Sequence, residues 1–473
     1  MAGFIESVET VNSAINNVAW GIPMLTLLIG AGLWLTIGSG GVQFAHFGHA
    51  MKHTLGRIFK RQHTDDKGAT TPFQALSIAM SATVGTGNIA GVSGAILLGG
   101  PGAVFWMWIS ALVGMATKYS EIVLAIKFRE RNANGEWAGG PMYYIKNGLG
   151  KHWKWLGAIF CAFGAFAAFG IGNISQTNTM ASSVVGLFKH FSYNPDGLPV
   201  GTINLVFGLI VAAFVGLVLL GGLKRIGAVT SKLVPFMSIF YIIGALVIII
   251  ANIGSIGQVL GDIFTGAFGG FKPVTGGVTG FLIAETVKFG FKRGCFSNEA
   301  GLGSAPIAHA TADTDGPVQQ GLYGIFEVFV DTIIICTLTA LAVLMSGVII
   351  PYGDNSIAGA LTTDAFASVF GGGFANVFLT VAIICFATST ILGWALYGSR
   401  CCEFLFGGKS VKPYQVLFVL VVVAGSVMDL SLAWDISDTL NALMGIPNLI
   451  GLLFLSPVVI KLTREYFKAL PKG

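Results

Sequence analysis

The sequence predicts an all-α polytopic membrane protein with about eleven transmembrane helices, built as a five-plus-five inverted repeat with one extra N-terminal helix. Three observations lead to this prediction. Hydrophobic residues make up 54% of the 473 residues and charged residues only 10%, whereas a soluble domain has roughly 25% charged residues. Apolar segments long enough to span a bilayer recur along the whole chain. A glycine-rich interruption occurs in two of those segments.

Most of the apolar segments have about 20 residues or more, which is enough for a helix to cross the hydrocarbon core. The predicted spans are residues 19–38, 73–99, 102–127, 155–187, 201–221, 228–252, 277–307, 318–349, 371–402, 412–430 and 435–461. The span 277–307 departs from a clean apolar pattern because it contains Glu285, Lys288, Lys292 and Arg293. These charges argue against a lipid-facing outer half for that span.

Lys and Arg residues are distributed unevenly between the loops. The first 19 residues contain none, whereas the loops that follow the first and third spans are rich in them. Because cytoplasmic loops carry the excess of positive charge, the N-terminus is predicted outside and the C-terminus inside, which eleven spans satisfy. The loop 129–154 is polar, glycine-rich and aromatic. It is either a cytoplasmic gate or coupling loop, or only a solvated connector.

The two glycine-rich interruptions, residues 84–95 and 294–305, resemble each other. Aligned, Asn88 meets Asn298, and Ala90-Gly91 meets Ala300-Gly301. Each glycine costs a helix about 1 kcal/mol relative to alanine, and a broken membrane helix is tolerated where its freed backbone groups line a cavity. Each broken span is the first of a unit of five consecutive spans. Because five is odd, the two units insert in opposite directions. The predicted parts are residues 1–70 (extra helix and cytoplasmic loop), 71–252 (first repeat) and 253–473 (second repeat).

Paired broken helices indicate the binding site of a secondary transporter. Thr86, Gly87 and Asn88 are placed to offer backbone N–H groups to a carboxylate. Gln176 is a mid-span amide that either binds substrate, with Asn173 beside it, or joins two helices. The other predicted substrate-binding residues are Ser297 and Asn298 of the second break, and Trp394 with Phe166 or Phe169 as aromatic cover, although membrane aromatics commonly only pack.

Several charged residues lie inside predicted spans and need partners. Lys118 and Glu121 are three residues apart and are expected to pair with each other. Glu327 and Asp331 share a helix face, where they could line a water path, carry protons, or pair with the basic residues of span 277–307. Glu299 in the second break could orient a substrate ammonium or lock the backbone.

Four motifs resemble the alanine/glycine:cation symporter family over nearly the whole chain. They are residues 84–91 (VGTGNIAG), 99–108 with 114–121 (GGPGAVFWMW and GMATKYSE), 139–144 (GGPMYY) and 292–301 (KRGCFSNEAG). The resemblance implies a leucine-transporter type fold and sodium-driven uptake of alanine or glycine, with glutamine in some members. It also implies the plasma membrane, the inner membrane of a bacterium or archaeon.

The resemblance also implies where sodium binds. By similarity to the fold, the backbone carbonyls of Ser81 and Val84 face the adjacent hydroxyls of Ser389 and Thr390. Thr388 as one of that pair is the alternative register, and hydroxyls that bond their own helix are the structural alternative. Sodium is expected as the coupling ion, with no other cofactor.

Other function classes find little support in the residues. A membrane enzyme needs a catalytic constellation, but His309 stands nearly alone in the spans. A channel needs filter-like repeats or charged rings, and no nucleic-acid-binding motif is present. The expected partners are a small neutral amino acid, sodium and the lipid bilayer. The alternative is a sodium- or proton-coupled transporter of glutamine or another neutral amino acid.

Overall fold

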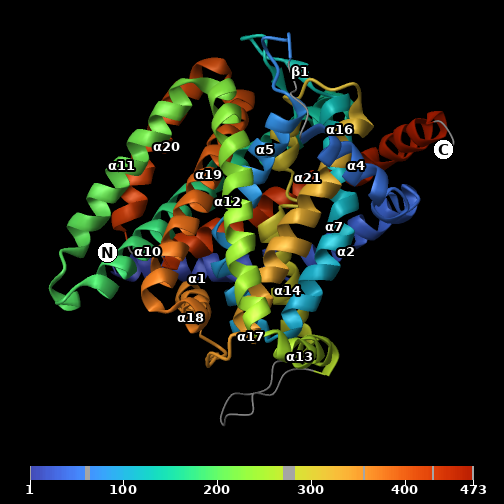
Figure 1. The fold of residues 1–473 in the computed structure, drawn as a ribbon. Coiled ribbons are helices and arrows are strands. Elements are labelled where there is room, and N and C mark those ends of the chain that lie inside the picture. Colours follow the sequence, from blue (N-terminus) through green and yellow to red (C-terminus); the bar gives the residue numbers. More distant parts are fainter. Residues whose placement is uncertain (1, 59–63, 270–282, 355–356, 429–430, 471–473) are drawn as a thin grey trace.

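A computed structural model describes residues 2–58, 64–269, 283–354, 357–428 and 431–470. It is a helical bundle, and its described strands are two short ones that pair as an antiparallel hairpin, β1 (Glu130–Arg131) and β2 (Trp137–Ala138). Figure 1 shows this hairpin at one end of the bundle and the helices α13 (Ile256–Gly269) and α18 (Ala358–Phe370) at the other. The residues 277–282 and 429–430 of two predicted spans lie outside the described part of the chain.

The first predicted repeat begins with a helix that is broken as expected. α5 (Pro72–Thr83) ends before a short 3-10 turn at Thr86–Asn88, and α6 (Ala90–Gly99) follows it. The next helices are α7 (Gly102–Lys127), α9 (Lys154–Phe169), α10 (Ser175–Phe191), α11 (Val200–Leu220) and α12 (Gly222–Ala251). A π-helical turn at Gly170–Ile174 joins α9 to α10, so these two helices form the predicted span 155–187.

The second predicted repeat also begins with a broken helix. α14 (Ile283–Asn298) and α15 (Ala305–His309) are separated by an unwound segment. The following helices are α16 (Pro317–Val328) and α17 (Thr337–Met345), joined by a π-helical segment at Phe329–Cys336, then α19 (Gly372–Phe406), α20 (Val411–Val427) and α21 (Ser431–Ala469). The division at residues 252 and 253 stays a prediction.

Within the described residues, nine helices are long and apolar enough to cross a membrane. They correspond to nine of the predicted spans, and the two broken helices account for the other two. The α11 and α20 helices lie side by side at one edge of the bundle, and α12 stands between them and α14 (Figure 1).

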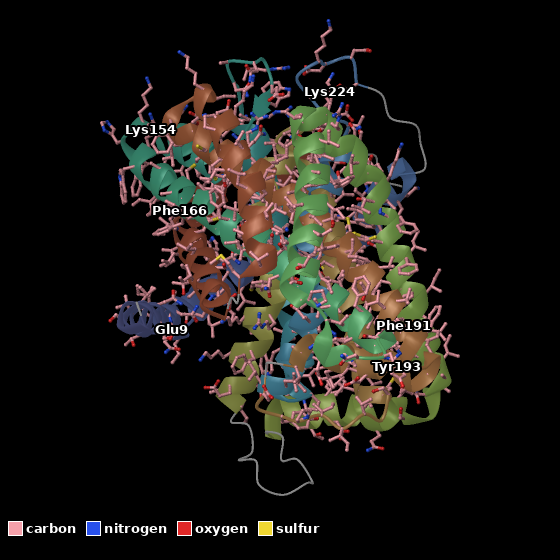
Figure 2. The ribbon with its side chains drawn as sticks, turned by 90° about the vertical axis from the view of Figure 1, so that its left-hand side faces the viewer. Glu9, Lys154, Phe166, Phe191, Tyr193 and Lys224 are labelled. Atoms are coloured by element: carbon pink, nitrogen blue, oxygen red, sulfur yellow. The ribbon has the colours of Figure 1, made fainter. Side chains whose placement is uncertain are left out.

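The remaining elements connect the spans or flank them. α2 (Ile22–Gly38) is the predicted first span, but α1 (Ala2–Ala19) was not predicted. Figure 2 shows α1, marked by Glu9, projecting from the side of the bundle. The short connecting helices are α3 (Val42–Ala45), α4 (Phe47–Ile58) and α8 (Pro141–Tyr144), a π turn at Ile145–Leu149, and 3-10 turns at Lys151–Trp153, Pro195–Gly197, Ile253–Ser255 and Gly408–Ser410.

The two ends of the bundle carry different residues. Lys154 and Lys224 lie at the same end, and Phe191 and Tyr193 lie at the opposite end (Figure 2). Both lysines belong to loops that the charge distribution assigns to the cytoplasm. The structure therefore brings two of the predicted cytoplasmic loops to one side of the molecule.

Candidate functional site

The unwound turn of the first break is stabilised by the Asn88 side chain and has glycine where its neighbours lie close to the backbone. Asn88 Oδ1 accepts a hydrogen bond from the backbone nitrogen of Gly85 at 2.9 Å, which fixes the unwound turn. A Cβ atom on Gly85 would lie 2.5 Å from Thr390 Oγ1, and one on Gly87 would lie 3.3 Å from the ring of Phe296. At Gly85 only glycine allows its neighbour to approach the backbone so closely, and at Gly87 a Cβ atom would require the Phe296 ring to shift slightly.

The second break has a different support. Glu299 adopts a left-handed conformation with φ of 54°, as do Gly301 and Gly303 with φ of 90° and 80°. Glu299 Oε2 accepts a hydrogen bond from Ser304 Oγ at 2.5 Å. The Lys118 ammonium donates to the carbonyl of Asn298, the last residue of α14, at 2.6 Å. These contacts are consistent with the locking of the backbone, one of the two predicted roles of Glu299, and the other role stays a prediction.

A polar cluster joins the two breaks. Asn88 Nδ2 donates to Ser297 Oγ at 2.9 Å and to Asp331 Oδ1 at 2.6 Å. Ser297 Oγ donates to Asp331 Oδ2 at 2.9 Å. Asn298 Nδ2 instead donates to Thr332 Oγ1 at 3.0 Å. The side chains of Asn88, Ser297 and Asn298, all predicted to bind substrate, are thus engaged in holding the breaks together.

Two predicted substrate residues meet at the first break. Thr86 Oγ1 donates to Gln176 Oε1 at 3.0 Å, and both side chains are buried. Gln176 Nε2 donates to the carbonyl of Ile171 across the π turn at 3.0 Å. Asn173 is not its partner, because Asn173 Nδ2 donates to the carbonyl of Phe418 in α20 at 2.7 Å. The Gln176 amide and the Thr86 hydroxyl form the polar edge of the candidate substrate site.

The predicted sodium residues also converge. Ser389 Oγ donates to Phe386 O of its own helix at 2.7 Å and lies 3.2 Å from the carbonyl oxygen of Ser81. Thr390 Oγ1 donates to Phe386 O at 3.1 Å and faces Gly85, as described above. Val84 is fully buried at the end of α5. The pair Ser389 and Thr390 therefore faces the first break.

The alternative register finds no support, since Thr388 Oγ1 lies 3.6 Å from Met180 Sδ in α10.

The aromatic predictions have mixed outcomes. Trp394 is 1% exposed and packs so closely on Gly172 that a Cβ there would clash with it. Phe169 packs against Tyr414 and Phe418 of α20, with ring centroids 4.9 and 5.6 Å away. Phe166 is 65% exposed on the outer surface (Figure 2). The expectation that either phenylalanine covers the substrate is not supported.

The predicted pair of Lys118 with Glu121 is wrong. Lys118 Nζ lies 3.0 Å from Glu327 Oε1 in α16, and both side chains are fully buried. Glu121 Oε1 instead accepts a hydrogen bond from Asn448 Nδ2 at 2.5 Å. His309 Nε2 lies 3.1 Å from Glu327 Oε2, so this histidine has a buried partner that the sequence did not indicate.

The basic residues of α14 do not pair with Glu327 or Asp331 either. Lys292 Nζ forms an ion pair with Asp438 Oδ2 of α21 at 2.7 Å. Lys288 Nζ lies 4.0 Å from Glu285 Oε2 of its own helix. Of these charges, Lys292 is therefore paired inside the protein, whereas the side chains of Lys288 and Glu285 stay partly exposed, at 32% and 45%.

A cavity of about 730 Å³ leads from the first break toward the end of the bundle that carries α18. Gly87 and Phe296 belong to its lining at the breaks, and Arg293 and Asp438 belong to its wall. The rest of its lining comes from α6, α10, α18 and α19: Ala90, Gly91, Asn178, Thr179, Ser182, Ser183, Gly186, Ala358, Gly359, Ala360, Thr363, Asp364, Asn376, Thr380 and Ile383. Phe296, Arg293 and Asp438 were not predicted as site residues.

At the opposite end, residues 64–70 and residues 129–138, which contain the hairpin, form what we call the clasp. Arg131 donates to both carboxylate oxygens of Asp66, at 3.0 and 2.5 Å, and this hydrogen bonding lowers the pKa of Asp66 to about 2. The guanidinium groups of Arg129 and Arg131 each lie 4.1 Å from the ring centre of Trp137. The Asp66 carboxylate is therefore ionised at any physiological pH.

The clasp forms hydrogen bonds with residues that flank both broken helices at this end. Thr70, two residues before α5, pairs with Thr311 and Asp313 through backbone hydrogen bonds of 2.9 and 2.7 Å. Arg129 donates to the carbonyls of Ala310 and Ala312 beyond the end of α15, at 2.9 and 2.6 Å.

The hairpin is also joined to α19. Arg400 donates to Glu136 at 2.5 Å, and Asn132 donates to Glu403 at 3.0 Å. The loop 129–154 therefore contains a structured contact between three helices rather than only a solvated connector.

Comparisons with known proteins agree with this arrangement. The family model described as sodium:alanine symporter family matches residues 5–473. The sodium/alanine symporter AgcS of Methanococcus maripaludis is 46% identical over 470 residues, which cover 98% of this chain and 97% of that protein. The "Probable sodium/glutamine symporter GlnT" of Bacillus subtilis is 35% identical, covering 97% of this chain and 90% of that protein.

The fold has a solved counterpart as well. The crystal structure of MhsT in complex with L-phenylalanine matches with a TM-score of 0.56 at 14% identity, covering 87% of this chain and 100% of that chain. This likeness shows a leucine-transporter type fold, as the motifs implied.

Proposed function

Since the chain belongs to the sodium:alanine symporter family, it is a membrane transporter and not an enzyme, and we propose that it takes up alanine or glycine together with sodium. The observation that carries this proposal is the first break. There a buried amide and hydroxyl, Gln176 and Thr86, lie beside the glycines Gly85 and Gly87. Adjacent hydroxyls of α19 face the same break.

The substrate site is suited to the α-carboxylate and to a small side chain. The 3-10 turn Thr86–Asn88 begins the second half of the broken helix, where free N–H groups favour an anion. The Thr86 hydroxyl and Gln176 amide can exchange their mutual hydrogen bond for bonds to the substrate. The close neighbours of Gly85 and Gly87 leave little room for a large side chain at the break.

The sodium site is proposed beside it. The carbonyls of Ser81 and Val84 and the hydroxyls of Ser389 and Thr390 are neutral oxygen ligands, and hard cations prefer oxygen. To bind sodium, Ser389 would turn its lone pairs toward the ion while its proton keeps the bond to Phe386 O. The carbonyls that end α5 lie at the negative end of the helix dipole, which favours a cation.

Alternating access is supported by the difference between the two ends of the bundle. The cavity leads from the break toward α18, and the clasp closes the opposite end. With the N-terminus outside, this conformation is accessible from the exterior. Opening the other end requires the clasp to separate from α5, α15 and α19. The proposed location is the plasma membrane of a bacterium or archaeon.

The experiment that tests the function is sodium-driven uptake of labelled alanine in proteoliposomes, with competition by a panel of amino acids. Alanine and glycine should compete best, leucine weakly, and glutamate and lysine not at all, because a charged side chain needs a buried partner. Glutamine is included because of the relative GlnT. Strong inhibition by glutamate or leucine without inhibition by glycine would contradict this site, and uptake without a sodium gradient would contradict the coupling.

The orientation gives a second prediction. A cysteine in place of Tyr193, which is fully exposed, should react with an impermeant thiol reagent from outside intact cells. A cysteine in place of Lys154 should react only after the membrane is permeabilised, because the two positions lie at opposite ends (Figure 2). The parent protein, whose own cysteines are buried except for the half-buried Cys385, supplies the background. The reverse labelling pattern would overturn the topology.

A further inference from the structure

A groove of about 440 Å³ lies on the outside of the bundle, where α2 packs on the last third of α21. It is lined by Trp34 of α2 and by residues of α21 between Ser456 and Lys468. The two helices approach closely here because Gly38 has no side chain. A Cβ atom on Gly38 would lie 2.5 Å from Ile460 Cδ1. The groove is separate from the candidate transport site and from the clasp.

The C-terminal part of α21 has a defined position at the side of the bundle. It runs out sideways beside α4, in the half of the molecule that carries the β1–β2 hairpin (Figure 1). Contacts with α4 hold it there. The rings of His46 and Phe467 stack with centroids 3.5 Å apart, and His49 Nε2 lies 3.2 Å from the Tyr466 hydroxyl. Residues 461–468 are therefore part of the folded surface near the clasp end and do not form a free tail.

One exposed face of α21 changes from apolar to basic along this groove. Residues three and four positions apart share a helix face, and this face consists of the exposed residues Phe454, Pro457, Lys461, Arg464 and Lys468. On α2, Trp34 and Ile37 are 56% and 77% exposed. Apolar side chains followed by a tryptophan and then by basic residues are typical of a helix that passes from the hydrocarbon core into the headgroup layer.

The charges of the groove are unbalanced. Three basic side chains and one carboxylate, that of Glu465, line it, which leaves an excess of positive charge. Lys461 Nζ lies 3.9 Å from Glu465 Oε1, and the two side chains are 75% and 59% exposed, so this pair is weak. Within the described part of the chain, Arg464 and Lys468 form no ion pair. The groove therefore offers two uncompensated cations beside an apolar surface.

We propose that this groove binds an anionic phospholipid of the leaflet at the clasp end. Arg464 and Lys468 bind the phosphate, to which a guanidinium can donate two N–H groups. The acyl chains lie against Trp34, whose indole Nε1 donates to Ser456 Oγ at 3.0 Å and is thereby held in place. The ligand is a lipid and not a soluble phosphate, because a soluble anion would leave the apolar lining at Trp34 and Ile460 uncovered. The bound lipid attaches the end of α21 to the membrane surface and does not depend on which substrate is transported.

The test measures lipid bound to the purified protein by native mass spectrometry after release from an uncharged detergent. Dioleoylphosphatidylglycerol and dioleoylphosphatidylcholine are added separately, so that only the headgroup differs. We expect the first lipid molecule to bind at least about fivefold more tightly with the anionic headgroup, because each basic side chain near a membrane surface contributes roughly that factor. Arg464→Gln combined with Lys468→Gln should abolish this preference. Equal affinity of the wild type for the two lipids would overturn the site.

Lys224→Gln combined with Lys232→Gln is the matched control. It removes two positive charges from exposed positions of α12 outside the groove, and the preference should remain. If the control protein also loses the preference, binding follows the net charge of the protein and the site is overturned. Millimolar glycerol 3-phosphate, which has the phosphate but no acyl chains, should not displace the lipid, and displacement would overturn the assignment to a lipid. Because all four substituted side chains are exposed, the unfolding midpoint without lipid should stay that of the wild type in both variants.

Discussion

Replacing Lys118 by methionine should lower the stability of the protein by about 3–5 kcal/mol. The Lys118 ammonium and the Glu327 carboxylate are both fully buried and lie 3.0 Å apart. Removing the lysine leaves an uncompensated carboxylate in the interior and frees the carbonyl of Asn298. Thermal unfolding in detergent should show a large fall in the midpoint. The double variant Lys118→Met with Glu327→Met should recover part of the loss, because no unpaired charge then remains.

The exposed pair of Lys461 and Glu465 provides the control. Their charged atoms are 3.9 Å apart and the side chains are 75% and 59% exposed, and such pairs contribute only about 0–1 kcal/mol. Lys461→Met should therefore leave the unfolding midpoint nearly unchanged. A Lys118→Met protein as stable as the wild type would show that Glu327 is neutral in the folded protein and that the buried pair has been misassigned.

Replacing Thr390 by alanine should weaken the apparent affinity for sodium about tenfold or more, which corresponds to about 1.4 kcal/mol. The hydroxyl faces Gly85 at the first break and is one of four proposed oxygen ligands. Ser389→Ala should act in the same direction, because Ser389 Oγ touches the carbonyl of Ser81. The measurement is alanine uptake as a function of sodium concentration, normalised to the amount of protein in the membrane.

Thr388→Ala is the matched control for these two variants. It removes the same group one residue away on the same helix, but that hydroxyl lies against Met180 Sδ. Its sodium dependence should remain that of the wild type. If Thr388→Ala shifts the sodium dependence while Ser389→Ala and Thr390→Ala do not, the ion site lies on a different face of α19.

The breaks could be predicted because glycine leaves a signal in the sequence itself. Two matched interruptions at 84–95 and 294–305 located the unwound segments of both broken helices. The pairing of Lys118 could not be predicted in the same way. The spacing of Lys118 and Glu121 indicated a shared helix face, but Glu327 comes from a helix about 200 residues away. Contacts between helices depend on packing, which one sequence without relatives does not reveal.

Phe169 does not lie on the same helix face as Gln176 for a specific structural reason. Phe169 and Gln176 are seven residues apart, and in a regular α-helix such residues lie on one face. The π turn at Gly170–Ile174 inserts an additional residue between them. One residue corresponds to about 100° of rotation, so Phe169 turns toward α20 while Gln176 turns toward the break. Helix α1 was not predicted for a different reason, because its sequence lacks a continuous apolar run.

The ammonium of Lys118 makes the two broken helices differ in what stabilises their carbonyl ends. It neutralises the carbonyl end of α14 with a charge that is covalently attached, so it neither dissociates nor competes with ions in solution. The corresponding end of α5 faces the Ser389 hydroxyl instead, and under the proposed function the cation there is sodium from the medium. One broken helix thus carries its own cation, whereas the other is proposed to take its cation from solution. Depleting the medium of salt should loosen α5 and α6 selectively, and hydrogen exchange should locate the change in that half alone.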